Sequence, residues 1–271
     1  MLTFAVSSRA ASAIRPVIQI PVKQNGLARP NRQHRCLPTV QAAATGEMLL
    51  DRRITQAMPA SRVKAELALE DLIQGNQRFR QGVLQNCVVD SRRFEELTAG
   101  QAPPAIVLCC SDSRVPPEMV LDQGMGDVFV IRVAGNILED HVLASMLYAI
   151  GNLGSRLVMV MGHSKCGACT AAQGAFIASK SGERCVSSES DPISILLTRL
   201  LDPCNKLVDR ASKNGSAKAD LKSILPVEAV VKENALHVAE ITLQGLQDNL
   251  AGQETFWRSD ISIRIIGASA R

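Results

Sequence analysis

Two short apolar segments, each followed at once by polar side chains, constrain the fold more than any other feature of this sequence. Residues 105–109 read AIVLC and residues 157–161 read LVMVM. Apolar runs of this length are typical of buried strands in a parallel sheet, which needs helices on both faces. In such sheets ligands bind where a strand ends and the next helix begins. We therefore expect the functional residues directly after these two segments.

The residues that follow both segments are of types that bind metal ions. Cys110 follows the first, while the second continues into Gly-His-Ser-Lys-Cys, which contains His163 and Cys166, and then into an Ala-rich stretch that predicts a helix near Gly167. The carboxyl ends of parallel strands meet at one edge of a sheet, so Cys110 can approach His163 and Cys166. Two thiolates and one imidazole leave one position of a tetrahedral zinc ion open, as in catalytic zinc sites. The pattern predicts one zinc ion per subunit.

Two charged residues close to Cys110 fit a catalytic role beside such a metal. Asp112 lies two positions after Cys110, and Arg114 lies two positions further. Zinc held by two thiolates acidifies its bound water less than a three-histidine site, where water titrates near pH ~7. Arg114 can keep Asp112 ionised in a bidentate pair, and Asp112 can then orient a zinc-bound hydroxide toward an electrophile. If the pair breaks, Asp112 can instead take the fourth zinc position and close the site.

Strands and helices alternate along the rest of the chain. Further strands are predicted at 127–133 and 261–266, helices at 62–81, 139–153, 193–210 and 219–250, and a polar loop at 179–192. This alternation predicts an α/β fold with a central, mainly parallel four-stranded sheet flanked by helices. The helix at 62–81 forms an N-terminal arm with Ser61 as candidate N-cap, and it must pack on its own sheet or on another subunit. Its apolar stripe consists of Ala65, Leu67, Leu69, Leu72, Ile73 and Phe79.

The first 46 residues differ in charge from the remainder. Six of the chain's 30 basic residues lie there and no acidic residue precedes Glu47, so the remainder has 24 basic and 26 acidic residues, a net charge of −2. Basic segments without acids are typical of organelle transit peptides, and VQAAA at 40–44 is a candidate cleavage region. We expect 1–46 to be a leader to the chloroplast, with the mitochondrion as the alternative organelle and a disordered basic tail as the other interpretation. Residues 47–271 are then the catalytic domain.

Composition argues against several classes of partner. The slightly acidic balance of residues 47–271 gives no support for nucleic-acid binding. No run approaches the roughly 18 apolar residues that a membrane span needs. The eight cysteines lack the spacing of a disulfide scaffold, which favours reduced thiols or metal ligands. Cys109 precedes Cys110 in an alternating strand, so we expect it to point into the core instead.

Three motifs resemble those of the β-class carbonic anhydrases. CSDSRVPPE at 110–118 and GHSKCGA at 162–168 carry that family's Cys-x-Asp-x-Arg and His-x-x-Cys patterns, and GDVFVIRVAGN at 126–136 lies between them. The resemblance extends from about Gly75 to Ile266, which is most of the chain.

The resemblance implies both a set of metal ligands and a reaction. By position, Cys110, His163 and Cys166 correspond to the family's zinc ligands, and Asp112 and Arg114 to its catalytic dyad. The family reaction is the reversible hydration of carbon dioxide to bicarbonate and a proton. Its members are homodimers or higher homo-oligomers in which N-terminal helices embrace the partner, which implies a second subunit for the helical arm.

Two other functions fit part of the sequence. Cys166 and Cys169 form a Cys-x-x-Cys pair at the start of a helix, which is the layout of a thioredoxin-like dithiol redox enzyme. That interpretation gives no role to Cys110, Asp112 or His163, and a measurement of bound zinc distinguishes it. A zinc-binding but catalytically inactive carbonic anhydrase relative is the other alternative, and an assay of carbon dioxide hydration distinguishes it.

Overall fold

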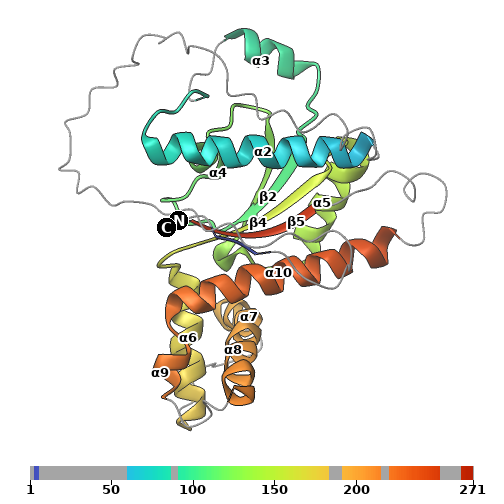
Figure 1. Ribbon diagram of the computed structural model, residues 1–271. Helices are drawn as coiled ribbons and strands as arrows, with labels where there is room; N and C mark the ends of the chain where they lie inside the picture. The colour runs from blue at the N-terminus through green and yellow to red at the C-terminus, as the bar shows by residue number, and fades with distance from the viewer. Residues whose placement is uncertain are drawn as a thin grey trace.

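A mainly parallel sheet lies at the centre of the molecule (Figure 1). The computed structural model describes residues 3–5, 60–86, 91–182, 191–214, 220–250 and 264–270. The strands are β1 (Thr3–Ala5), β2 (Ala105–Cys109), β3 (Val128–Arg132), β4 (Leu157–His163) and β5 (Arg264–Ala270), in the order β1-β5-β4-β2-β3. Strands β3, β2, β4 and β5 run parallel, and β1 pairs antiparallel with β5. The predicted α/β class with a mainly parallel sheet is therefore confirmed.

Helices cover both faces of this sheet. They are α2 (Ala60–Gln81), α3 (Ser91–Thr98), α4 (Pro117–Val120), the 3-10 turn η1 (Ala134–Asn136), α5 (Asp140–Asn152), α6 (Gly167–Lys180), α7 (Pro192–Arg199), α8 (Leu201–Lys213), α9 (Leu221–Ile224) and α10 (Val227–Leu250). Figure 1 shows α2 across one face and α5 and α10 on the other. Alternate residues of β2 and β4 enter the two cores, as the period of two requires. Among the described helices none is long and apolar enough to cross a bilayer.

Helix α2 packs on the sheet of its own chain. Ala65, Ala68 and Leu72 are buried in one cluster with the residues of β2 and β4 that face this side. The predicted apolar stripe is wrong at two positions, since Leu67 is 52% and Phe79 38% exposed. A helix on a sheet buries only one narrow stripe, and these two side chains lie outside it. Helix α2 begins at Ala60, so Ser61 lies inside its first turn and is not the N-cap.

Several predicted segments differ from the structure in extent, and the sheet has a different number of strands. The predicted count of four strands is wrong, because the three-residue β1 adds a fifth strand that is too short to show a period. Strand β5 continues to Ala270 through Gly-Ala-Ser-Ala, and small residues of this kind favour strands only weakly. The helix predicted at 193–210 is divided into α7 and α8 at Leu200, and that at 219–250 into α9 and α10. Pro226 explains the second division, because proline disfavours helical backbone at the residue before it.

Part of the chain falls outside the described residues. This holds for most of the predicted leader at 1–46, of which only Thr3–Ala5 is described, and for 183–190 in the predicted loop. The leader and its cleavage region therefore stay predictions.

Candidate metal centre

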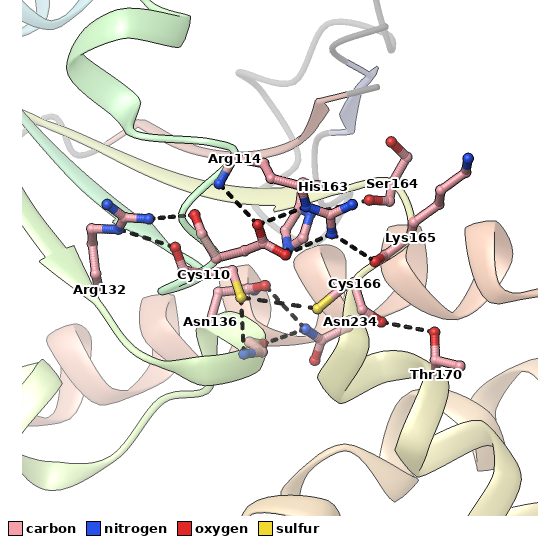
Figure 2. A network of polar contacts seen from close by, with 12 residues as sticks. Cys110, Arg114, Arg132, Asn136, His163, Ser164, Lys165, Cys166, Thr170 and Asn234 are labelled. Atoms are coloured by element: carbon pink, nitrogen blue, oxygen red, sulfur yellow. Dashed lines mark hydrogen bonds and ion pairs between the residues drawn. The ribbon is translucent and has the colours of Figure 1, made fainter.

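The register of two buried strands brings the three predicted metal ligands together. Cys109 of β2 pairs with Met161 of β4, so Cys110 leaves the sheet beside the Gly162–His163 end of β4. Cys166 follows on the turn into α6. One ligand atom from each of Cys110, His163 and Cys166 lies within 4.8 Å of the others, although Cys110 is 56 positions from Cys166 in the sequence. Figure 2 shows the two sulfur atoms, 4.0 Å apart, facing each other.

His163 presents a free nitrogen in this cluster. Its Nδ1 lies 3.1 Å from the carbonyl oxygen of Ser164. A carbonyl only accepts hydrogen bonds, so Nδ1 carries the ring proton and Nε2 keeps its lone pair. Nε2 is buried and makes no hydrogen bond within the described residues. A buried ring nitrogen without a hydrogen bond, next to two sulfur atoms, fits a zinc ligand whose other nitrogen is held by a carbonyl.

Both cysteine side chains are protonated when no metal is bound. The contact with the Cys166 thiol, together with burial, raises the pKa of Cys110 to about 12. The contact with Cys110 lowers the pKa of Cys166, but a hydrogen bond with Cys169 and burial outweigh it and raise the value to about 11. Ionising two facing thiols in an apolar site costs much free energy unless a cation compensates their negative charge. The cluster therefore has the chemistry of a metal site.

Asp112 and Arg114 form the predicted ion pair beside this cluster. Arg114 donates from Nη2 to Asp112 Oδ2 at 2.6 Å and from Nε to Oδ1 at 2.9 Å, and its backbone N–H also donates to Oδ1 at 3.0 Å. These hydrogen bonds hold the pKa of Asp112 well below its usual range, so the carboxylate is ionised at neutral pH. Asp112 Oδ2 lies 3.8 Å from His163 Nε2, which places the carboxylate at the border of the metal cluster.

The same ion pair lies where the buried cluster meets solvent. The three candidate ligands are at most 5% exposed, whereas the side chains of Asp112 and Arg114 are 19% and 57% exposed. Arg114 also donates to the carbonyl oxygen of Lys165 at 3.1 Å (Figure 2). Lys165 has a positive φ of 54° and directly precedes Cys166. Arg114 thus links the two loops that supply the cluster.

Sequence reasoning missed Arg132. This β3 residue donates from Nε to the carbonyl oxygen of Cys110 at 3.1 Å and from Nη2 to that of Asp112 at 2.6 Å. It therefore fixes the backbone that carries one candidate ligand and the candidate catalytic carboxylate. An arginine in a predicted strand is a weak signal of a functional role. The residues around it in the sequence do not show that its side chain contacts the end of a neighbouring strand.

Sequence reasoning also missed a contact to the Cys110 sulfur. The backbone N–H of Gly135 in η1 donates to Cys110 Sγ at 3.4 Å. Gly135 has a φ of 66°, and a Cβ there would lie 3.0 Å from Leu200 and 3.2 Å from Ala168. Asn234 of α10 donates from Nδ2 to the carbonyl oxygen of Gly135 at 2.8 Å.

The remaining described cysteines do not join the cluster as ligands. Cys109 is fully buried in the core between the sheet and α2, on the other face of the sheet from Cys110, as predicted. Burial raises its pKa to about 12. Cys169 and Cys204 are also buried, and none of the five described cysteines forms a disulfide. The raised pKa of Cys166 and its 1% exposure argue against an activated dithiol, because a nucleophilic cysteine needs a lowered pKa and access. The thioredoxin-like interpretation is therefore not favoured.

Comparison with known proteins identifies the family. A family model described as carbonic anhydrase matches residues 105–252, which is more than half of the 271-residue chain. The chain belongs to the β-carbonic anhydrase family. All five predicted site residues lie inside the matched segment, and so do Arg132, Gly135 and Asn234.

Relatives that are similar in sequence agree with this assignment. Carbonic anhydrase 2 of Mycobacterium tuberculosis is 43% identical over 109 residues, which are 40% of this chain and 53% of that protein. The carbonic anhydrase of Synechocystis sp. is 41% identical over 106 residues, 37% of this chain and 38% of that protein. The chain thus matches about half or less of the length of these relatives.

Two β-carbonic anhydrase structures are also similar. The β-carbonic anhydrase CcaA is 28% identical, with a TM-score of 0.47, and the similarity covers 73% of this chain and 88% of CcaA. The Coccomyxa β-carbonic anhydrase in complex with acetazolamide is 21% identical, with a TM-score of 0.49, over 64% of this chain and 71% of that one.

Proposed function

We propose that this protein catalyses the reversible hydration of carbon dioxide to bicarbonate and a proton, with one zinc ion held by Cys110, His163 and Cys166. One observation carries the proposal: three donor atoms of types that bind zinc lie within 4.8 Å of one another beside an ionised, arginine-held carboxylate. When bound there, zinc supplies a Lewis acid that lowers the pKa of water and makes a nucleophile available at neutral pH.

The protein side chains orient the reactants. Asp112 Oδ2 accepts a hydrogen bond from the nucleophilic oxygen and so directs a lone pair of that oxygen toward the carbon of carbon dioxide. Arg114 holds both carboxylate oxygens of Asp112, which keeps the acceptor ionised and correctly aligned. In this step a C–O bond forms while one C=O π bond of carbon dioxide opens, and its electron pair moves to the oxygen that carries the negative charge of bicarbonate. The proton that water gives up to become the nucleophile passes to solvent at the exposed side of the pair. If the ion pair with Arg114 broke, Asp112 could turn toward the three ligands, take the fourth position on the metal and so close the site.

Stopped-flow measurement of carbon dioxide hydration tests this function. We expect the zinc-loaded protein to accelerate hydration, and Asp112→Asn to keep one zinc ion per chain while losing about 100-fold or more of the turnover rate. A protein that holds zinc but does not accelerate hydration would instead be the inactive relative. Wild-type turnover in Asp112→Asn would remove the carboxylate from the mechanism.

We also propose that the protein is a homodimer or a higher homo-oligomer. Strand β3 is the outer strand next to β2, and its five residues are only partly buried although four of them are apolar. An apolar edge strand is a surface that folded proteins normally cover. Five of the large exposed apolar side chains lie on α2, α3, α4 and the turn before β3: Leu67 and Phe79 of α2, Phe94 of α3, Met119 of α4, and Met125.

Sedimentation analysis of two charge variants tests the assembly. Leu67→Glu lies on this apolar surface, whereas Ile193→Glu introduces the same charge at a 62% exposed position on α7, away from α2 in Figure 1. We expect the first variant to shift the protein toward monomer and the second to leave the dimer intact. A monomeric wild type would refute the proposal.

We propose further that residues 1–46 direct the protein to the chloroplast and are then removed. The absence of acidic residues before Glu47 supports a transit peptide. A fusion of residues 1–46 to a fluorescent protein, offered to isolated chloroplasts and mitochondria, distinguishes the two organelles. We expect import into chloroplasts and equal hydration activity for residues 47–271. If those residues do not fold alone, the leader belongs to the domain.

A further inference from the structure

We infer that Asn234 of α10 is a positioning residue for the metal ligand Cys110, which it controls through the backbone of Gly135. This inference rests on the proposed zinc site and adds a residue to it that no local motif indicates. The contact chain runs from the Asn234 side chain to the Gly135 carbonyl, and from the Gly135 N–H to the Cys110 sulfur. Figure 2 labels Asn234 and Cys110, the two ends of this chain.

The geometry of the η1 turn makes this chain of contacts possible. Two consecutive residues, Gly135 and Asn136, have positive φ values of 66° and 44°. Left-handed backbone at two successive positions is unfavourable, above all at the non-glycine residue, so it persists only where the surroundings hold it. Asn234 Nδ2 donates to the Gly135 carbonyl at 2.8 Å and lies 3.4 Å from Asn136 Oδ1. It therefore holds the peptide that follows Gly135 and the side chain of the next residue.

The turn is joined to Cys110 by more than this contact. The N–H of Val133, which lies between β3 and the η1 turn, donates to the Cys109 carbonyl, and the Val133 carbonyl accepts from Ser111 N–H. These hydrogen bonds keep the turn beside Cys110, while the Asn234 contact sets how its amides point. The Gly135 N–H is then directed at the sulfur from a distance of 3.4 Å.

An N–H that donates to a thiolate affects a metal site in two ways. It restrains the sulfur in the position from which it can share the ion with His163 and Cys166. It also draws charge from the sulfur and so lowers the electron density that the ligand gives to zinc. Both effects matter at a site with two thiolate ligands, which already donate much charge.

The burial of Asn234 argues that the contact is needed. Asn234 and Asn136 are each 1% exposed, and Asn234 Oδ1 and Asn136 Nδ2 make no hydrogen bond within the described residues. Burying amide groups that are only half satisfied costs free energy, which an apolar residue on α10 would avoid. The Nδ2 donor of Asn234 bonds to both Gly135 and Asn136, and these two residues form the turn that contacts Cys110.

Two variants of Asn234 and one control test the inference through metal binding. Asn234→Asp keeps the shape but replaces the donor with an acceptor, and Asn234→Ala removes the side chain. We expect each to raise the dissociation constant for zinc by about 10- to 100-fold, the usual effect of losing a residue that supports a ligand. Thr242→Val is the control, because Thr242 lies on the same helix, is fully buried, and has a hydroxyl without a partner in the described structure. It should bind zinc like the wild type.

Cobalt substitution supplies a signature that a general loss of stability would not change. The sulfur-to-cobalt charge-transfer band should shift in both Asn234 variants and stay unchanged in Thr242→Val. An unshifted band and unchanged zinc affinity in folded Asn234 variants would overturn the inference and leave the proposed function intact. A wild type that binds neither zinc nor cobalt would overturn both.

Measurement on the unmodified sequence covers the case in which the variants do not fold. In full-length protein loaded with ¹¹³Cd and labelled with ¹⁵N, an N–H···S contact to a ligand sulfur transmits scalar coupling from the metal to the amide proton. We expect coupling between ¹¹³Cd and the Gly135 amide proton. Its absence, with cadmium bound to Cys110, would overturn the inference.

Discussion

Zinc binding is expected to release two protons, because both cysteine ligands carry a thiol proton in the metal-free protein. The pKa of Cys110 is raised to about 12 and that of Cys166 to about 11. Both values lie more than three units above pH 7.5, so the thiolate form of either residue is rare before the metal arrives. Zinc binds the thiolate, and each cysteine must therefore give up its proton on binding.

The pH dependence of the affinity follows from this proton count. Releasing two protons multiplies the apparent binding constant by about 100 for each pH unit, which corresponds to about 2.7 kcal/mol. The contribution of the thiols to this slope holds from pH 7 to 9 because their raised pKa values lie well above that range, and any proton lost by zinc-bound water adds to it. Binding is thus expected to strengthen as pH rises and to weaken as pH falls.

Calorimetry measures the proton count directly. Zinc is titrated into the metal-free protein at pH 7.5 in two buffers of different ionisation enthalpy, and the difference in observed heat gives the number of protons released. Competition with a chelator of known affinity from pH 7 to 9 measures the slope independently. Cys109→Ala is the matched control, because Cys109 is a buried thiol of raised pKa adjacent to Cys110 but lies in the opposite core. It should leave the count at the wild-type value.

A count near zero would refute the reasoning, since it would mean that both sulfurs are already thiolates in the metal-free protein. A count that falls from two to one in the Cys109 variant would show that the wrong cysteine had been assigned. The second result would require a different ligand set.

Three further predictions concern the ligands, the ion pair and the packing of α2. Cys110→Ala and Cys166→Ala should not retain zinc through gel filtration, as measured by elemental analysis, and one zinc ion per chain in either variant would contradict the ligand assignment. Arg114→Ala should keep zinc but lower the hydration rate by about 100-fold, because its carboxylate partner loses its alignment, and a wild-type rate would contradict this. Leu72→Ala should lower the free energy of unfolding in urea by about 2–5 kcal/mol, whereas Ile193→Ala, at a 62% exposed position on α7, should change it by less than about 0.5 kcal/mol. Equal losses would mean that α2 does not pack on its own sheet.

Local sequence patterns predicted the central strands well. Strand β2 has the predicted bounds, 105–109, because five consecutive apolar residues between polar segments can be satisfied only inside a covered sheet. Strand β4 begins as predicted at Leu157 but continues to His163. Its last two residues pair with β5, from more than 100 positions away, so no local pattern could reveal the extension.

The stripe predicted for α2 shows where periodicity is insufficient. Apolar residues at helical spacing indicate that a helix has a buried side, but not how wide that side is. The sheet beneath α2 covers Ala65, Ala68 and Leu72 and leaves Leu67 exposed. The width of contact depends on the shape of the partner surface, which is a property of the folded molecule.

By itself, the sequence determined the α/β class, the two strand ends that carry the site, and the candidate residues there. These are local properties, since strand period, turn residues and ligand chemistry are all encoded within a few positions. Only the tertiary structure decided that the donor atoms of Cys110, His163 and Cys166 share a space within 4.8 Å. It also decided which residues support them: Arg132, 22 positions from Cys110, and Asn234, 99 positions from the Gly135 carbonyl that it binds. The reason is physical, because hydrogen bonds to backbone atoms depend on where the chain passes and leave no pattern in the residues that accept them.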